Sequence, residues 1–294
     1  MTKPGRLSVG VIGAGRVGAV LGAALARAGH EVVAASGISE ESRTRIEALL
    51  PEAAHEEPQG VVAAADLVLL TVPDDSIAAV AAGLASLGAW RPGQIVVHAS
   101  GRYGTEVLAD AAAAGALTLA IHPAMTFTGT SMDLSRLTDA TFAVSGPAPI
   151  LPIAQALVVE MGGEPLVLAD HDRAAYHAAL VHGANHVVTA VTQAAATLAR
   201  IGIEDPGKVL GPLVHASVDG AVRDAPGAVT MLTGPVVRGD AGTVAAHLAA
   251  LADQPETLFA YRAMARATAD LALAGRRIGP AAYADIIATL GVDP

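Results

Sequence analysis

One short segment, YHAALVHGANH at residues 176–186, gathers the side chains best suited to acid–base chemistry, with three histidines and one asparagine. On a helix, His182 and His186 stand one turn apart, a spacing that some metal sites use. No acidic residue neighbours the pair as a third ligand, so we expect no metal and interpret the segment as a polar seam facing a cleft. His177, His182 and Asn185 are therefore candidate catalytic residues, since histidine exchanges protons near neutral pH and asparagine can donate a hydrogen bond.

A second candidate is Arg238, within TGPVVRGD at residues 233–240. Placed after a Gly-Pro turn, its guanidinium could hold a substrate carboxylate through two hydrogen bonds. An ordinary surface ion pair, with Asp240 or another acid, explains the same residue equally well. The sequence leaves these two interpretations open.

Polar groups also follow three successive apolar runs in the N-terminal half of the chain. The segments are TVPDD at 71–75, HASG at 98–101 and HPAMTF at 122–127. Ligands of open α/β sheets bind beyond the carboxyl ends of the strands. We therefore expect Ser100 and His122 to border an active crevice, and Val72, Pro73 and Asp74 to contact a cofactor. Taken alone, a histidine here is more often structural, and an aspartate is an ordinary helix cap.

The third feature is a glycine pattern, Gly13-x-Gly15-x-x-Gly18, inside GAGRVG. It lies between an apolar run and an alanine-rich stretch, as in dinucleotide-binding βαβ units. There the first glycine makes a tight turn, the second lets the backbone approach a pyrophosphate, and the third allows helix and strand to pack. The helix N-terminus holds the phosphates. We expect this turn to bind the cofactor through Gly13, Gly15, Arg16, Val17 and Gly18.

The next apolar run, Glu31–Ala35, is followed by Ser36, where NAD-binding proteins usually carry an acid that grips the ribose. A carboxylate would repel a 2′-phosphate, whereas a hydroxyl can donate to it and Arg43 or Arg45 can neutralise it. NADP is therefore favoured over NAD. The alternative is that both arginines are ordinary solvent-exposed residues of a helix whose N-terminus is stabilised by acidic residues.

The elements that position these groups follow from apolar periodicity and its interruptions. Strands are predicted at Leu7–Ile12, Glu31–Ala35, Asp66–Val72, Gln94–His98, Leu117–Ile121 and Thr141–Val144, with a short one at Pro165–Leu168. Helical stretches separate most of them, which predicts an α/β fold with a doubly wound parallel Rossmann sheet. The Pro- and Gly-rich segment 145–152 marks a boundary between residues 1–148 and an all-helical C-terminal domain, residues 149–294.

The second domain is dominated by one predicted helix, Asp170–Arg200, which is apolar around most of its circumference. Such a helix is buried between other helices or in a dimer interface. We expect a homodimer, with burial inside a single subunit as the alternative.

Composition excludes several classes of function. A chain of 294 residues with formal charge −10 and no basic run is a poor partner for nucleic acid. It has no cysteine, so disulfides and thiol catalysis are excluded. The apolar helix is interrupted by His182, Asn185 and His186, which disfavours a membrane span. We expect a soluble cytoplasmic protein.

Taken together, GAGRVG, TVPDDSI, HASG, HPAMTF, the YHAA…N helix and TGPVVRGD resemble one family along nearly the whole chain. That family joins a Rossmann-like NADP-binding domain to a helical domain long described as of unknown function. Its broader relatives are 3-hydroxyacid dehydrogenases, pyrroline-5-carboxylate reductases and ketopantoate reductases. The resemblance implies an NADPH-dependent oxidoreductase acting on a small carboxylate substrate, and some similar proteins serve as an alternative ketopantoate reductase.

One departure from the relatives affects the expected chemistry. The hydroxyacid dehydrogenases and common ketopantoate reductases carry a catalytic lysine four residues before a helix asparagine. Here Asn185 is present, but that position is Val181, and the only lysines are Lys3 and Lys208. A histidine is the natural replacement as proton donor, since its pKa lies near the working pH. The competing hypotheses are a non-catalytic NADP-binding sensor or scaffold and, less favoured, a metal-dependent hydrolase.

Overall fold

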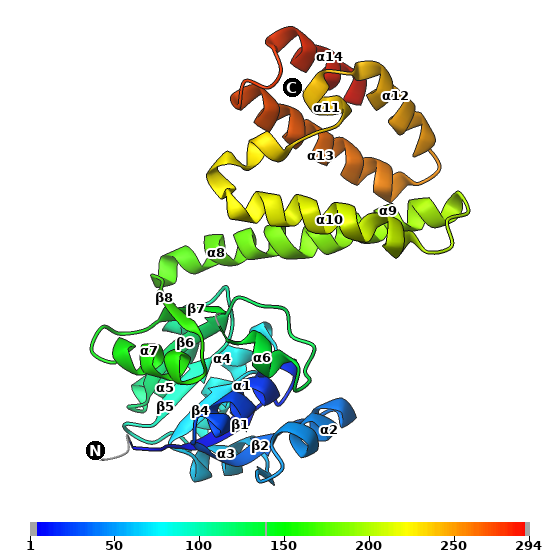
Figure 1. The fold of residues 1–294 in the computed structure, drawn as a ribbon. Coiled ribbons are helices and arrows are strands. Elements are labelled where there is room, and N and C mark those ends of the chain that lie inside the picture. Colours follow the sequence, from blue (N-terminus) through cyan, green and yellow to red (C-terminus); the bar gives the residue numbers. More distant parts are fainter. Residues whose placement is uncertain (1–4, 139, 292–294) are drawn as a thin grey trace. The chain divides into compact units, whose positions relative to one another are not determined.

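The computed structural model describes residues 5–138 and 140–291 (Figure 1). The chain forms two compact units, one extending to Val181 and the other starting at His182.

The first unit is built on an eight-stranded sheet with the order β3-β2-β1-β4-β5-β6-β7-β8. All neighbouring strands are parallel except β6 and β7, which are antiparallel. The strands are β1 (Ser8–Ile12), β2 (Glu31–Ser36), β3 (Ala54–His55), β4 (Leu67–Leu70), β5 (Ile95–His98), β6 (Leu117–Pro123), β7 (Thr141–Ser145) and β8 (Glu164–Val167). The α/β class with a doubly wound Rossmann sheet is confirmed.

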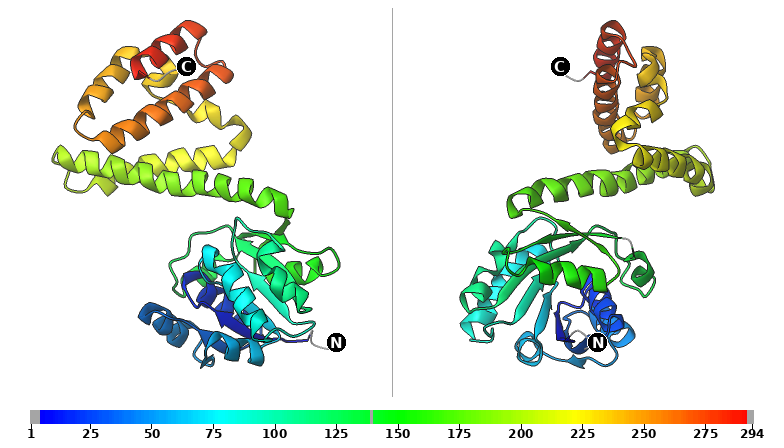
Figure 2. Two further views of the ribbon diagram at one scale, coloured as in Figure 1. Left: turned by 180° about the vertical axis from the view of Figure 1, so that it is seen from behind. Right: turned by 60° about the vertical axis from the view of Figure 1, so that its left-hand side comes forward.

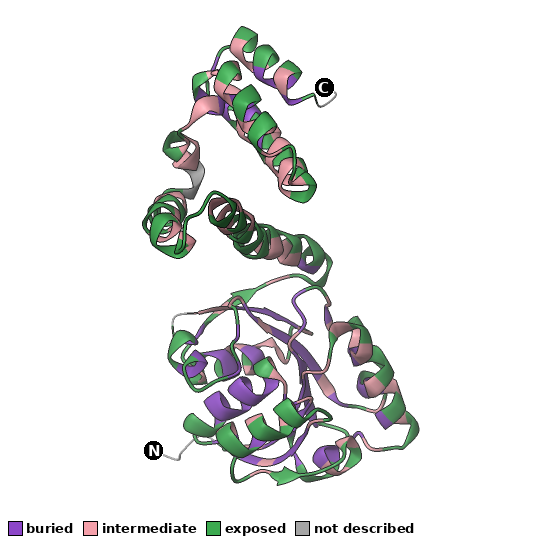
Figure 3. Ribbon diagram, turned by 90° about the vertical axis from the view of Figure 1, so that its right-hand side faces the viewer, coloured by how far each residue is buried: buried purple, intermediate pink, exposed green. Residues whose placement is uncertain are grey.

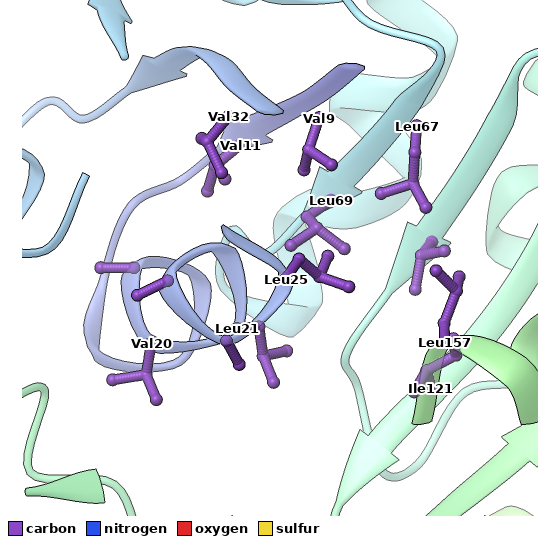
Figure 4. Packing of buried hydrophobic residues seen from close by; sticks show 14 of the residues in the cluster. Val9, Val11, Val20, Leu21, Leu25, Val32, Leu67, Leu69, Ile121 and Leu157 are labelled. Carbon is purple, nitrogen blue, oxygen red and sulfur yellow. The ribbon is translucent and has the colours of Figure 1, made fainter. Parts of the chain in front are cut away.

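Helices cover both faces of this sheet (Figure 2). The helices of the first unit are α1 (Arg16–Arg27), α2 (Glu40–Leu49), α3 (Pro58–Ala64), α4 (Ile77–Ser86), α5 (Ala109–Ala113), α6 (Asp133–Arg136), α7 (Leu151–Glu160) and α8 (Arg173–Leu180), with short 3-10 helices at Asp74–Ser76, Thr105–Leu108 and Asp170–Asp172. Because side chains alternate along a strand, Val9 and Val11 pack on the face that holds α1 and α7, whereas Ile12 packs on the face that holds α3 and α4. Figure 4 shows Leu21 and Leu25 of α1 within the first of these two layers.

Strand register brings the carboxyl ends of the central strands to one edge. Ile12 pairs with Ser36 on β2 and with Leu70 on β4, Leu70 pairs with His98, and His98 pairs with Ala120 on β6. Residues that directly follow these positions are therefore neighbours, although they are far apart in sequence.

The second unit is helical. Its elements are a π-helical turn that starts at Val181 and ends at Asn185, α9 (His186–Arg200), α10 (Pro206–Arg223), a 3-10 helix (Ala225–Met231), α11 (Pro235–Arg238), α12 (Ala241–Ala250), α13 (Pro255–Ala274) and α14 (Pro280–Leu290). A small core forms between α11, α12, α13 and α14, with Val244, Ala269 and Ile286 fully buried. By contrast, α9 and α10 contain no buried residue (Figure 3).

The predicted strands lie within two residues of the observed ones at each end, and β3 is an additional strand too short to leave a periodic signal. The compact units meet at residues 181 and 182, whereas the sequence places its boundary at 148 and 149. The physical reason is that β8 pairs with β7 and the start of α8 is buried against the sheet. The predicted 170–200 helix is helical throughout, interrupted by the π turn.

Candidate functional site

The glycine turn has the geometry of a phosphate cradle. Gly13 adopts φ +85°, and a Cβ there would lie 2.8 Å from the backbone nitrogen of Val72. At Gly18 a Cβ would lie 2.1 Å from Thr71 Oγ1 and 2.6 Å from the carbonyl oxygen of Gly13. At Gly15 its nearest neighbour would be 3.9 Å away, so this position faces open space. Gly13 and Gly18 thus permit close packing, while Gly15 leaves room for a ligand at the start of α1.

Beside this turn lies a cavity of about 340 Å³, lined in part by Gly13, Ser36, Arg43 and Val72. Ser36 ends β2, and no carboxylate stands at that position. Glu56 and Glu57 also line the cavity, so its charge is mixed. The residues fit a dinucleotide: an open phosphate approach at Gly15, with a hydroxyl and a guanidinium at the end of β2.

The two arginines considered for a 2′-phosphate have separate surroundings. Arg43 lines the cavity. Arg45 lies by Gly129, where a Cβ would be 2.8 Å from its Nε and 2.9 Å from Cγ of Arg16. Of the two, Arg43 is therefore the better placed to meet a ligand in the cavity.

The ends of β4 and β5 are joined by a hydrogen bond between side chains. Ser100 Oγ donates to Asp74 Oδ2 at 2.7 Å. His98 is fully buried, with Nε2 donating to the Gly104 carbonyl at 2.7 Å and Nδ1 accepting from the Ser100 amide at 3.2 Å. Both ring nitrogens of His98 are thus occupied, which is the structural role that a lone strand-end histidine most often has.

The end of β6 meets α8. His122 Nδ1 lies 3.1 Å from the Tyr176 hydroxyl, and the rings of His122 and His177 are 6.0 Å apart in an edge-to-face arrangement. Gly101 permits this approach, since a Cβ there would lie 2.6 Å from Cδ2 of His177 and 2.9 Å from Nε2 of His122. Loop, strand and helix therefore converge on two imidazoles and one phenol.

A buried arginine holds α8 in this position. Arg173 is fully buried and donates from Nε to Ser145 Oγ at 2.8 Å and from Nη1 to the Ser100 carbonyl at 2.9 Å. Its Nη2 donates to the carbonyls of Ala120 and Ala143, both at 3.1 Å. The guanidinium thus ties the first turn of α8 to the β5 loop, β6 and β7. One turn later the helix presents Tyr176 and His177.

Burial shifts the acid–base properties of this cluster. Desolvation lowers the pKa of His98 to about 4, and the Arg173 charge adds to the effect. Desolvation, with the nearby His177 and Arg173, lowers the pKa of His122 to about 4. Desolvation raises the pKa of Tyr176. At neutral pH the cluster therefore contains neutral His98 and His122 and a protonated phenol.

The remaining predicted residues belong to the second unit and are exposed. His182 Nδ1 and His186 Nδ1 are 2.9 Å apart, one turn from each other. Asn185 ends the π turn, and Arg238 ends α11 beside Asp240, whose carboxylate caps α12 through the amide of Thr243. Within the described residues, no three His, Cys, Asp or Glu side chains are grouped so as to hold a metal ion.

The structure thus places Ser100 and His122 after neighbouring strand positions and His177 beside His122, while the catalytic roles of all three stay predictions. Sequence reasoning missed Arg173 and Tyr176. Their position was recognisable, since both lie in or beside the YHAA motif, but nothing in the sequence indicated that an arginine would be buried in carbonyl groups.

Comparisons with known proteins agree with this architecture. Residues 1–123 match the Rossmann-like domain, and residues 140–268 match a domain of unknown function, DUF2520. The two-domain resemblance predicted from the sequence is confirmed. No curated protein matches the chain. In the described part of the chain, none of the helices has the length and apolar character needed to cross a membrane.

Several solved structures are similar at low identity. A candidate NADP oxidoreductase from Bacteroides fragilis is 22% identical with a TM-score of 0.76, over 90% of this chain and 98% of that one. A protein from Thermotoga maritima is 20% identical with a TM-score of 0.66, over 91% and 99%. An imine reductase from Pseudomonas sp. is 20% identical with a TM-score of 0.60, over 97% and 92%. At such identities the likeness shows the fold.

Proposed function

We infer that this chain, which joins a Rossmann-like domain to a DUF2520 domain, is an NADPH-dependent oxidoreductase that reduces a small 2-keto acid of the ketopantoate type or an imine. One observation carries the proposal. The phosphate cradle of β1 and α1 and the imidazole–phenol cluster of β5, β6 and α8 lie along the same carboxyl edge of one sheet. Ligands of such sheets bind at that edge.

The cofactor assignment rests on this chain's own residues. The α1 N-terminus and the open approach at Gly15 would hold the pyrophosphate, and Ser36 with Arg43 would meet the 2′-phosphate. When bound, NADPH supplies a hydride. The chain must then supply a proton donor and a group that orients the substrate.

The first unit offers Ser100, His122 and His177 for proton transfer and hydrogen bonding. Asn185 and His182 remain proposed catalytic residues in the second unit, and Arg238 is the proposed anchor for a substrate carboxylate. Loss of a general acid lowers turnover by roughly 10²-fold or more, whereas loss of a carboxylate anchor mainly raises KM.

A second candidate function is an NADP-binding sensor without catalysis. The observation in its favour is the absence of a lysine at Val181, with Lys3 and Lys208 the only lysines in the chain.

The test is NADPH oxidation by the full-length protein against a panel of 2-keto acids and cyclic imines, starting with ketopantoate, together with titration of NADPH and NADH. We expect NADPH to bind several-fold more tightly than NADH, and Ser36→Asp to reverse that order. We expect His177→Ala or His182→Ala, and Asn185→Ala, to lower kcat by roughly 10²-fold. Arg238→Ala should raise KM while NADPH affinity stays unchanged.

Each result separates the alternatives. Tight NADPH binding without turnover of any panel member would favour the sensor. Equal affinity for both nucleotides would contradict the NADP assignment. Full turnover in Asn185→Ala and in both histidine variants would move the chemistry to Ser100 and His122.

A further inference from the structure

The contact between His122 and Tyr176 is the only one that links a strand-end imidazole to a phenol hydroxyl within the described part of the first unit. His122 Nδ1 and Tyr176 Oη are 3.1 Å apart, and the two rings meet edge to face with centroids 5.6 Å apart. Both side chains are partly exposed, so a ligand at the carboxyl edge of the sheet can reach them.

The direction of this hydrogen bond depends on which ring nitrogen of His122 carries the proton. His122 Nε2 lies beside Gly101, where a Cβ would be 2.9 Å from it, and it is not among the buried side-chain nitrogens that lack a partner in the described residues. Solvent can therefore supply the hydrogen bond of Nε2. In its Nδ1–H form, His122 donates to Tyr176 Oη, and the phenol hydrogen is left to point elsewhere.

From this geometry we infer that the Tyr176 hydroxyl delivers the proton to the reacting oxygen or nitrogen of the substrate, with His122 restoring it. The inference rests on the proposed reductase function and names its proton donor. The Tyr176 O–H bond breaks as a new O–H or N–H bond forms on the substrate. The phenolate oxygen then takes the Nδ1 proton of His122, while Nε2 takes one from solvent. Exchange of the ring protons with solvent returns His122 to the Nδ1–H form, so the net uptake is one proton in each turnover.

The groups around the pair set its charge state at rest. His122 is surrounded by His177 on α8, Arg173 at the start of α8, Asp74 after β4 and His98 on β5. Burial, with the nearby His177 and Arg173, lowers the pKa of His122 to about 4 and keeps it uncharged at neutral pH. Burial raises the pKa of Tyr176, so the phenol is protonated at rest and the charge that develops on the substrate must draw its proton away.

Arg173 fixes the distance between the two groups. Its hydrogen bonds to the carbonyls of Ser100 and Ala120 hold the first turn of α8 against the strands that carry Gly101 and His122. Arg173 is thus a positioning residue, whereas Tyr176 is the group that would touch the substrate.

The first test needs no turnover. ¹⁵N NMR of histidine-labelled protein, with His122 assigned from a His122→Gln sample, reports which ring nitrogen carries the proton. We expect the Nδ1–H form at pH 7, and a change of the Nδ1 shift in Tyr176→Phe. A resonance pattern of the Nε2–H form would overturn the inference, because Tyr176 would then donate its own proton to His122.

The second test is kinetic, with ketopantoate or whichever panel member is turned over. Tyr176→Phe should lower kcat by roughly 10²-fold and increase the solvent deuterium isotope effect, with KM and NADPH affinity within about threefold of the unmodified protein. Tyr283→Phe is the matched control, since it removes a phenol hydroxyl that donates to Asp270 in the second unit. It should leave kcat unchanged.

The outcomes distinguish this inference from the function on which it rests. Full turnover in Tyr176→Phe, with substrate and cofactor bound as before, would overturn the role of Tyr176 and leave the reductase intact. No turnover of any panel member by the unmodified protein would overturn both the reductase and the proton donor.

Discussion

The two units differ in how completely they bury their apolar and polar side chains. In the first, both faces of the sheet are packed, and the buried polar side chains of the described chain all belong to it, among them His98, Ser100 and Arg173. In the second, α9 and α10 contain no fully buried residue, and Leu213 and Val222 are 65% and 74% exposed. The first unit therefore covers its apolar side chains, whereas the second leaves apolar side chains of α9 and α10 exposed.

The second unit also contains an apolar cavity of about 550 Å³ between α9, α10 and α13. Its lining is mostly apolar and includes Ala194, Leu198, Leu213 and Met264, with polar side chains at Gln193, Thr197, Thr257 and Tyr261. Exposed apolar patches of this kind mark interaction sites. We propose that a second copy of this chain covers this groove, so that the predicted apolar helix is buried between subunits. The second unit would then serve in assembly as well as supplying the proposed residues His182, Asn185 and Arg238.

The largest expected effect is a loss of stability and NADPH affinity in the first unit. Gly18→Ala would place a Cβ 2.1 Å from Thr71 Oγ1 and 2.6 Å from a backbone oxygen that cannot move away. Overpacking of this kind costs about 1–3 kcal/mol or more, and we expect NADPH affinity to fall by roughly 10²-fold or beyond. Fluorescence of Trp90, the single tryptophan, reports unfolding of this unit, and NADPH titration reports the cradle.

The matched control is Gly83→Ala in α4, where nothing lies within 4 Å of the added Cβ. It should raise stability by about 0.4–1 kcal/mol and leave NADPH binding unchanged. Equal behaviour of the two variants would contradict the proposed packing at Gly18.

In the second unit, we expect a substitution in the apolar groove to abolish the dimer and leave NADPH binding intact. Ala194→Glu places a carboxylate in the groove, where burying an unpaired charge on association costs several kcal/mol. We expect the unmodified protein to be a dimer at micromolar concentration by light scattering, and this variant to be a monomer that still binds NADPH. Leu87→Glu, at a 62% exposed position following α4, is the control and should remain dimeric. A monomeric unmodified protein would refute the dimer.

The last expected effect develops only in acid and distinguishes the two units. The pKa of His98 is about 4 in the folded protein and near 6.5 in the unfolded chain. As the pH falls from 6.5 toward 4, the unfolded chain binds a proton at His98 that the folded protein does not bind. The free energy of unfolding is therefore at its full value above pH 6.5 and decreases over this range. The loss is about 3 kcal/mol. The stability measured by urea unfolding, followed by Trp90 fluorescence, should therefore decrease over this pH range. The decrease should be smaller in His98→Gln.

Replacing the exposed His182 by Ala should leave the acid dependence of Trp90 unfolding unchanged. If His98→Gln does not fold, NMR titration of His98 in the unmodified protein gives its pKa directly. A midpoint near 6.5 would contradict the assigned burial effect.

Much of the first unit was predictable because its signals are local. Apolar runs such as Asp66–Val72 are long enough to specify buried strands, and the glycine spacing specifies a turn whatever surrounds it. The strand-end rule predicted Ser100 and His122 at one edge, because neighbouring parallel strands run in the same direction and therefore end at the same edge. The domain boundary at 148 and 149 stays a prediction, because residues that match DUF2520 from 140 onward pack partly within the first unit.

By itself, the sequence determined which segments are strands and helices, where the cradle lies, and that no lysine stands at the helix position where relatives carry one. Only the tertiary structure decided which helix residues meet the strand ends. Arg173 is an ordinary charged residue in sequence, and its burial against the carbonyls of Ser100, Ala120 and Ala143 depends on three strands that are distant along the chain. That anchoring selects Tyr176 and His177 as the partners of His122, because hydrogen bonds between remote segments form only once the sheet has assembled.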